Sequence, residues 1–288
     1  MRTLRAAAAT ALLLAMVGGP AAAADPVLEP GGDPTYYLAL GDSLAAGYQP
    51  IGRPEDDHRT RAGYPDQLWL MARARYPDLQ LVNLACPGET TVTFRESHER
   101  CSYPAGSQLA EALDFLADHT GEVAFITIDI GFNDFEGASL AYLFPGIEGI
   151  EERLPSILAD LQAVASGVPI VGMNIYDPFL TYWLGDDDDR VLARQSVVAM
   201  QLINEALEGV YAEAGIPVAD VEAAFAIDDW TTTVPLAGHG QVPRNLAVLC
   251  ERTWQCHPPP LGPDRHANVL GYRAMADAFA AQLGIAPA

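Results

Sequence analysis

Ser43, Gly88 and Asn133 each follow a run of mostly apolar residues that is typical of a strand. The run before Ser43, Tyr36–Leu40, suits a buried strand better than an amphipathic helix. Open α/β sheets place their ligands at the carboxyl ends of strands, where these residues would lie. A serine there can attack an ester carbonyl, while backbone N–H groups and an asparagine amide bind the developing oxyanion. The pattern therefore indicates acyl transfer.

Each of these residues also has a purely structural interpretation. Asp42 and Ser43 suit the cap of a following helix, Gly88 suits a turn, and Asn133 suits a turn or a cap. Taken singly, each position is better explained in this way. Three such residues at successive strand ends favour a shared site.

A serine hydroxyl needs a base, and the sequence offers six histidines. His266 is best placed, because it directly precedes the last expected helix and an acidic residue, Asp264, lies nearby. His239 and His257 remain candidates. The other three lie in polar loops or at the end of a helix: His58, His98 and His119.

Composition limits the class of protein. The chain has 288 residues, half of them apolar, which is ample for a large core, and no linker divides it. Its net charge of −22 argues against a nucleic-acid partner, which would require a basic patch. We therefore expect a single domain over residues 35–285 without a nucleic-acid partner. The expected partner is a small-molecule or lipid ester, and the expected oligomeric state is a monomer.

The first 24 residues have the pattern of a secretory signal peptide. Two arginines precede an apolar run, 6–17, that is too short to span a bilayer, and Ala21–Ala24 offers a cleavage site. We expect cleavage near Ala24, a flexible leader over residues 25–34, and a secreted protein without a stable membrane anchor. An uncleaved anchor is the alternative, which the short apolar run disfavours.

Because the protein is expected to be secreted, its four cysteines are expected to form disulfides, which an even number of cysteines in a secreted chain suggests. Of the three possible pairings we favour the local one, Cys86–Cys101 with Cys250–Cys256, since each pair brackets a loop. No cysteine spacing and no H-E-x-x-H motif indicates zinc, and we expect neither a metal nor a cofactor. The run Asp186–Asp189 could bind calcium, but a solvated loop leading into a helix is the preferred interpretation.

Hydrophobic periodicity predicts strands that alternate with helices, which implies a doubly wound α/β fold with a parallel sheet. The expected strands are Tyr36–Leu40, Leu79–Leu84, Val123–Ile130, Val168–Met173 and Pro217–Asp220. The expected helices are Tyr64–Tyr76, Ser107–His119, Leu154–Val164, Asp189–Ala214 and Val269–Leu283. The segment Phe225–Asp264 is expected to be irregular.

Four ordered motifs resemble those of the GDSL, or SGNH, hydrolase family of esterases and lipases. They are Gly41-Asp42-Ser43-Leu44, Gly88, Gly131-Phe132-Asn133-Asp134 and His266. The chain is most similar to the secreted actinobacterial branch, including its cysteine-bounded loop after Gly88. The resemblance implies a flavodoxin-like three-layer sandwich around a central parallel sheet of about five strands.

The resemblance also implies roles for individual residues. Ser43 would be the nucleophile and His266 the base, with the Ser43 and Gly88 N–H groups and the Asn133 amide in the oxyanion hole. The family usually has an aspartate three residues before the histidine, but Pro263 occupies that position here. Either the Asp264 carboxylate or a main-chain carbonyl between Gly262 and Asp264 would then orient His266.

The predicted function is a secreted serine esterase or lipase that works through an acyl-enzyme. A carbohydrate deacetylase, which uses the same chemistry on acetylated glycans, is the second enzyme hypothesis. A secreted binding protein of the same fold without turnover is the alternative from another class.

Overall fold

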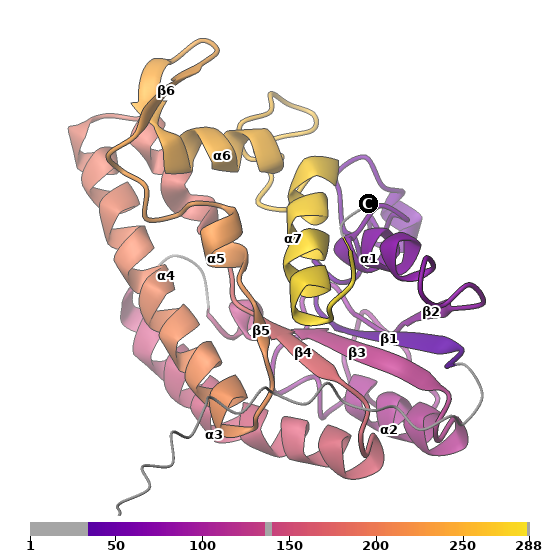
Figure 1. The fold of residues 1–288 in the computed structure, drawn as a ribbon. Coiled ribbons are helices and arrows are strands. Elements are labelled where there is room, and N and C mark those ends of the chain that lie inside the picture. Colours follow the sequence, from indigo (N-terminus) through magenta and orange to yellow (C-terminus); the bar gives the residue numbers. More distant parts are fainter. Residues whose placement is uncertain (1–33, 136–139, 287–288) are drawn as a thin grey trace, which may run out of the picture. The chain divides into compact units, whose positions relative to one another are not determined.

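Five parallel strands form the central sheet, in the order β2-β1-β3-β4-β5 (Figure 1). The strands are β1 (Tyr36–Gly41), β2 (Gln80–Asn83), β3 (Val123–Asp129), β4 (Ile170–Met173) and β5 (Val218–Ala219). This arrangement comes from a computed structural model, which describes residues 34–135 and 140–286. The predicted α/β fold with a parallel sheet of five strands is confirmed.

The register between the two central strands places Gly41 of β1 beside Asp129 of β3. Every residue of β3 is buried, and β1 is buried apart from its first residue. Helices cover both faces of a parallel sheet, so its central strands read as continuous apolar runs. Asp129 is an exception in such a run, because it ends the apolar strand β3 with a carboxyl group.

Helices form a layer on each face of the sheet. On one face, α1 (Tyr64–Ala72) packs against α7 (Val269–Gln282), and α7 also contacts the short α5 (Val221–Ala224). On the other face, α2 (Gln108–Asp118) and α4 (Asp187–Glu213) both contact α3 (Leu140–Val164). Figure 1 shows α1 and α7 on the opposite side of the sheet from α2 and α3.

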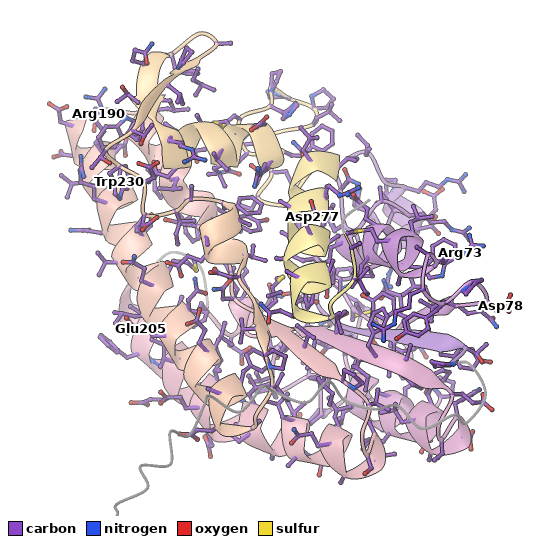
Figure 2. The ribbon with its side chains drawn as sticks, viewed as in Figure 1. Arg73, Asp78, Arg190, Glu205, Trp230 and Asp277 are labelled. Atoms are coloured by element: carbon purple, nitrogen blue, oxygen red, sulfur yellow. A yellow bond between two sulfur atoms is a disulfide. The ribbon has the colours of Figure 1, made fainter. Side chains whose placement is uncertain are left out.

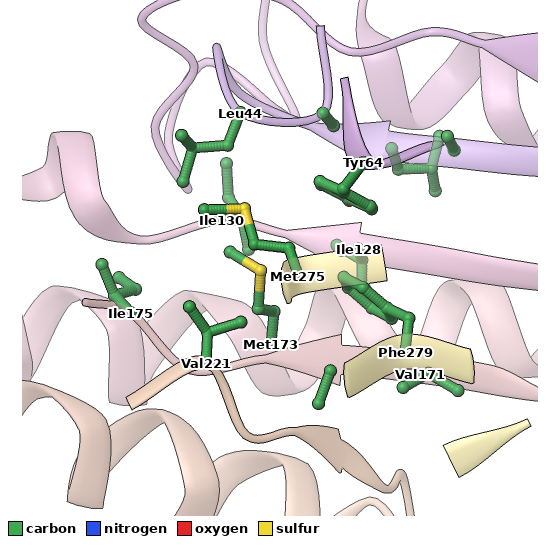
Figure 3. Close-up of a cluster of buried hydrophobic side chains, with 14 of the residues drawn as sticks. Leu44, Tyr64, Ile128, Ile130, Val171, Met173, Ile175, Val221, Met275 and Phe279 are labelled. Atoms are coloured by element: carbon green, nitrogen blue, oxygen red, sulfur yellow. The ribbon is translucent and has the colours of Figure 1, made fainter. Parts of the chain in front are cut away.

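The core between α7 and the sheet is made of closely packed apolar side chains. Met275 and Phe279 of α7 lie near Met173 and Ile128 of the strands, and all four are buried (Figure 3). Phe279 also stacks on Tyr64 of α1, with ring centroids 4.7 Å apart. Such contacts fix α7, the helix that His266 precedes, to the first helix of the chain.

The helix α3 begins at Leu140, fourteen residues before the predicted start at Leu154. Its inward residues continue the predicted apolar face, and Leu143 and Ile150 are buried together with Leu154. Pro145 and Pro155 lie inside the helix. Proline lacks a backbone donor and normally ends a helix, which weakens the helical signal over this stretch.

The segment 225–264 is more ordered than predicted. An antiparallel hairpin pairs β6 (Thr233–Leu236) with β7 (Gly240–Pro243), and α6 (Arg244–Arg252) follows at once. The prediction of an irregular segment was therefore wrong for these residues. The hairpin is short and half of its residues are solvent-exposed, so it has little of the apolar alternation that marks a strand.

Three 3₁₀ turns complete the described elements: η1 (Pro54–Asp56), η2 (Phe132–Asp134) and η3 (Pro178–Leu184). The structure contains two disulfides, Cys86–Cys101 and Cys250–Cys256, which are the pairs that the loop argument favours. The proposed signal peptide and nearly all of the leader, residues 1–33, lie outside the described residues. Within the described part of the chain, no helix combines the length and apolar character needed to cross a membrane.

Charged side chains gather on the outside of the molecule, as Figure 2 shows for Arg73, Asp78 and Glu205. Among the described residues, four acidic residues are exceptions to this rule because the whole residue is almost completely buried: Asp42, Glu89, Asp129 and Asp177. Burying a carboxyl group is costly unless it is hydrogen-bonded or protonated. Three of these four lie close to Ser43 and are considered with the site.

Candidate active site

Ser43 lies in a tight turn directly after β1. The turn is held by its own residues, because the backbone N–H of Leu44 donates to Asp42 Oδ1 at 2.9 Å. Residues 43–47 are turns and α1 begins only at Tyr64, so no helix starts at Ser43. The capping interpretation of Asp42 and Ser43 is therefore wrong, and the serine is presented by a strand end.

The imidazole of His266 reaches Ser43 from the segment before α7. His266 Nε2 lies 2.9 Å from Ser43 Oγ, and the ring stacks on Tyr48 with centroids 3.9 Å apart. Asn268 caps the helix that follows, since its side chain accepts from the N–H groups of Leu270 and Gly271. This cap determines where α7 begins, and with it the position of His266.

The carboxylate of Asp264 contacts the other ring nitrogen of His266. Asp264 Oδ1 lies 2.8 Å from His266 Nδ1 and also accepts from the backbone N–H of His266 at 2.9 Å. Of the two partners left open by the sequence, the structure places the carboxylate and not a main-chain carbonyl at Nδ1. Burial raises the pKa of Asp264, but the hydrogen bonds and charge of His266 outweigh it, so this pKa is lowered.

Asn133 lies on η2, one strand away from Ser43. Its Nδ2 group donates to Asp42 Oδ2 and to the carbonyl of Glu89, both at 3.0 Å. Gly131 precedes it with a φ of 117°, and a Cβ there would lie 3.0 Å from Ile150, so glycine suits this turn. Both amide protons of Asn133 therefore have acceptors in the free protein.

Gly88 adopts a φ of 86° in the turn that precedes Glu89. The following turn, at Thr91, is connected to η2 by Asp134, which is the last residue of η2. Asp134 accepts from the backbone N–H of Thr91 at 2.9 Å, and it also accepts from Arg153 at 3.0 Å. The loops that carry Gly88 and Asn133 are thus joined to each other. Gly88 itself is not among the described residues that line the pocket at Ser43.

A pocket of about 200 Å³ opens at the serine. It is lined by Ser43, Asn133 and His266 together with Asp42, Arg265 and the apolar residues Leu44, Phe132, Phe135, Ile175, Tyr176 and Pro178. A second groove of about 530 Å³ shares Arg265 and His266 with this pocket and is also lined by Asp264. That groove is lined by both aromatic and polar side chains, among them Phe179, Thr181, Tyr182 and Gln255.

The other histidines are placed away from this pocket or face other partners. His239 and His257 line a separate depression near the β6–β7 hairpin, so the structure does not bring either of them to Ser43. The ring of His58 contacts Tyr48 at a centroid distance of 5.2 Å. The ring of His119 packs on Phe115.

Cys86, His98 and Cys101 are the one group of described residues whose potential metal-ligand atoms lie within 4.8 Å of one another. Both sulfur atoms are bonded to each other in the disulfide, so they are not thiolate ligands here. Asp186 caps α4 in a capping box with Asp189, which matches the predicted start of a helix at this acidic run.

Sequence reasoning missed several residues that surround the pocket. Tyr48 stacks on His266, and the buried Gln108 accepts from the backbone N–H of Gly41 at 2.7 Å while donating to Glu89. Asp129 was also missed, although a carboxyl group at the end of an apolar strand was a readable signal. Arg265 was visible beside His266, but nothing in the sequence indicated that it lines the pocket.

Ser43, His266 and Asp264 thus form a hydrogen-bonded series at the carboxyl edge of the parallel sheet, an arrangement that is chemically capable of nucleophilic acyl transfer. The chain belongs to the GDSL-like lipase/acylhydrolase family, whose model matches residues 39–274. No curated protein shows significant similarity to the sequence.

Solved structures share the fold at low sequence identity. An extracellular lipase from Streptomyces rimosus is 19% identical with a TM-score of 0.55, over 86% of this chain and 99% of that one. A lipase from a goat rumen metagenome is 17% identical with a TM-score of 0.52, over 87% and 97%. A variant acetyl-xylooligosaccharide esterase from Geobacillus stearothermophilus is 19% identical with a TM-score of 0.50, over 88% and 96%.

Proposed function

We propose that this protein is a secreted serine hydrolase of carboxylic esters, an esterase or lipase that works through an acyl-enzyme. The observation that carries the proposal is the series of hydrogen bonds from Ser43 Oγ to His266 and from His266 to Asp264, at 2.9 and 2.8 Å. Membership of a lipase/acylhydrolase family agrees with it. The two disulfides agree with an extracellular location.

In the first step, Ser43 Oγ attacks the ester carbonyl while His266 Nε2 takes the hydroxyl proton. Asp264 holds the proton of Nδ1, so that Nε2 is the free acceptor, and it stabilises the imidazolium that forms. Because the pKa of Asp264 is lowered from its usual acidic value, this carboxylate is ionised at neutral pH. The tetrahedral intermediate then collapses, and His266 returns the proton to the departing alcohol.

The oxyanion would be bound by the N–H groups of Ser43 and Gly88 and by the amide of Asn133. Because both Asn133 protons already have acceptors, the oxyanion must take over one of them, either from Asp42 or from the carbonyl of Glu89. One such donor contributes about 3–4 kcal/mol to lowering the barrier. Water then hydrolyses the acyl-enzyme by the same steps, and no step needs a cofactor.

The two hollows beside His266 suit the two halves of an ester. His266 Nε2 faces Ser43 in the pocket of about 200 Å³, so the scissile ester lies there, and we assign the outer part of the alcohol to the adjoining groove with Tyr182 and Gln255. The acyl group then occupies the pocket of about 200 Å³ with its apolar residues Phe132, Phe135 and Ile175. This volume suits a short or medium acyl chain.

A glycan deacetylase is the second candidate. The groove supports it, because an exposed aromatic ring, Tyr182, with Thr181 and Gln255 beside it, offers stacking and hydrogen bonds to a sugar. The likeness in fold to an acetyl-xylooligosaccharide esterase is compatible with this candidate. The same catalytic residues would act in both cases.

The test is a panel of esters with the purified chain that begins at Asp25. We expect hydrolysis of p-nitrophenyl esters with a preference for short acyl chains, and none by Ser43→Ala. Acetylated xylan in the same panel separates deacetylase from esterase. Absence of turnover on every ester, with no labelling of Ser43 by a fluorophosphonate, would favour the binding-protein alternative. Amino-terminal sequencing of protein from the culture medium tests secretion and the cleavage site near Ala24.

A further inference from the structure

Asp129 is a buried carboxyl group directly behind the nucleophile turn. It ends β3 with only 2% of its surface exposed. Its Oδ2 accepts from the backbone N–H of Ala45 at 3.2 Å, and its Oδ1 accepts from the Tyr64 hydroxyl at 2.9 Å. Its carboxyl group also hydrogen-bonds to the carboxyl group of Asp42. Asp129 thus contacts the turn on both sides of Ser43.

Asp42 connects this buried group to the candidate oxyanion donor. It is 3% exposed, and its two oxygens accept from the Leu44 backbone and from the Asn133 amide, at 2.9 and 3.0 Å. A series of side-chain contacts therefore runs from Asp129 through Asp42 to Asn133.

Two carboxyl groups that hydrogen-bond to each other must share a proton, because two buried carboxylates at that distance repel each other. Burial raises the pKa of both, and the charge of Asp42 raises the pKa of Asp129 further, well above its usual value. Donation from the Leu44 backbone partly offsets the effect of burial on Asp42. Because both oxygens of Asp42 already accept from N–H groups, those of Leu44 and Asn133, we assign the shared proton to Asp129.

Among the described residues, none of the groups that shift the pKa of Asp129 is a cation, whereas His266 acts on the adjoining Asp42 and lowers its pKa. The groups that interact electrostatically with it come from four elements or their flanking turn and are all acids or phenols: Asp42, Tyr37, Tyr64, Tyr211 and Tyr272. Tyr64 donates its hydroxyl proton to Asp129, which leaves the carboxyl proton for Asp42.

Gly41 provides a second, independent sign that the carboxyl group of Asp129 is seated against the nucleophile turn. Gly41 lies beside Asp129 in the sheet register and has a φ of 136°. A Cβ on this residue would lie 1.9 Å from Asp129 Oδ1 and 2.2 Å from the Asp129 carbonyl. The glycine before Asp42 and Ser43 therefore makes room for Asp129.

We propose that Asp129 is a positioning residue, which holds a proton, donates it to Asp42, and thereby fixes the Ser43 turn and the Asn133 amide for catalysis. This inference rests on the proposed hydrolase function. When Asn133 turns toward an oxyanion, Asp42 keeps the hydrogen bond from Asp129. An ionised Asp129 would instead add a second negative charge behind the developing oxyanion, which the low local dielectric would make costly.

The test compares two replacements that differ only in polarity. Asp129→Asn keeps a donor for Asp42 and an acceptor for Tyr64, so kcat on p-nitrophenyl acetate at pH 8 should stay within about threefold of wild type. Asp129→Leu has a similar size but leaves Asp42, Tyr64 and Ala45 without their partner. It should lower kcat about tenfold to a hundredfold, the factor expected for an unpaired buried hydrogen-bonding group.

Infrared spectroscopy tests the proton itself and does not depend on turnover. The difference spectrum of wild type minus Asp129→Asn at pH 8 should contain the carbonyl stretch of a protonated carboxyl group. Asp66→Asn is the matched control, because burial raises the pKa of Asp66 only to about 6 and it is ionised at pH 8. Its difference spectrum should lack the band, and its kcat should equal that of wild type.

Three results would overturn the inference: an Asn variant as impaired as the Leu variant, a fully active Leu variant, or a missing infrared band. The first would show that an ionised carboxylate is needed. If Asp129→Leu does not fold, the Asn variant and the infrared band still decide. If wild type hydrolyses no ester, the proposed function fails, whereas the band still reports whether Asp129 is protonated.

Discussion

Ser43 Oγ lies 2.9 Å from His266 Nε2, although 223 residues separate the two in the chain. Packing between α1 and α7 brings them together, because Tyr64 stacks on Phe279 and the hydroxyl of Tyr272 donates to the carbonyl of Tyr48 at 2.6 Å. The contact between Ser43 and His266 therefore depends on α1 and α7, the first and last α-helices of the described fold.

Replacement of either partner should abolish turnover. Ser43→Ala and His266→Ala should each lower kcat by about 10⁶, the loss typical of a triad member, while the circular dichroism spectrum stays unchanged. Steady-state kinetics with p-nitrophenyl acetate measures the effect. His239→Ala and His257→Ala are the controls, since neither ring reaches the pocket at Ser43. A dead His239 variant would contradict the assignment of the base.

Asp264→Asn should slow turnover less than the loss of Ser43 or His266. The amide oxygen can still accept from His266, but the negative charge that stabilises the imidazolium is lost. We expect kcat to fall by about 10²–10⁴ with little change in KM. Near-wild-type kcat in this variant would show that the carboxylate seen at 2.8 Å from Nδ1 is dispensable.

Asn133→Ala should lower kcat by about 10²–10³, because it removes a donor to the oxyanion. The change also leaves Asp42 Oδ2 and the carbonyl of Glu89 without their partner, so thermal unfolding should be measured beside the kinetics. An effect on KM alone would indicate that Asn133 binds the ground state and not the oxyanion.

The two disulfides should differ in their effect on activity. Closing the 15-residue loop between Cys86 and Cys101 stabilises the fold by about 3 kcal/mol in the chain-entropy model, and the 6-residue loop by about 2 kcal/mol. Urea unfolding of Cys-to-Ser pairs measures both. Only the first pair should also lower kcat, because the backbone N–H of Cys86 donates to the carbonyl of Gly41 at 3.0 Å.

Asp177 should make stability depend on pH. Burial raises its pKa from 3.8 to about 6, so the folded state binds a proton that the unfolded state releases between these values. Stability from this group is full at low pH and falls as pH rises from about 4 to about 6. Asp177→Asn should therefore stabilise the protein at pH 8, by up to about 3 kcal/mol, and not at pH 3.5.

Urea unfolding at pH 3.5 and at pH 8 measures this difference. Asp78→Asn is the control, because the side chain of Asp78 is exposed (Figure 2). A gain that is equal at both pH values would show that the Asn variant acts through packing. The carboxyl group of Asp177, which accepts from Ser196 and from the backbone N–H of Phe179, would then not be the titrating group.

The sequence predicts the five strands well because periodicity and β-branched runs are local signals. It predicts the position of Ser43, Asn133 and His266 because their motifs lie at strand ends and before a helix. It leaves the partner of His266 open, since the conformation of residues 262–266 depends on Trp254, whose backbone N–H donates to the carbonyl of His266 at 3.0 Å. Contacts between segments that are far apart in the sequence leave no local pattern of residue types from which they could be predicted.

Other features needed the structure for the same reason. The contact of Asp129 with Gly41 depends on sheet register, and the stacking of Tyr48 on His266 depends on how α7 packs. The early start of α3 was hidden by its two prolines, whose cost is offset by burial of Leu143 and Ile150. Tertiary packing outweighs local propensity at these positions.

The order of the elements along the chain has a consequence for biosynthesis. Ser43 follows the first strand, whereas His266 precedes the last helix, α7, which ends at Gln282. A nascent chain therefore carries Ser43 long before His266, the proposed base, has been made. In the proposed mechanism, ester hydrolysis would begin only after α7 has docked, so the fold would delay activity until this helix has been made.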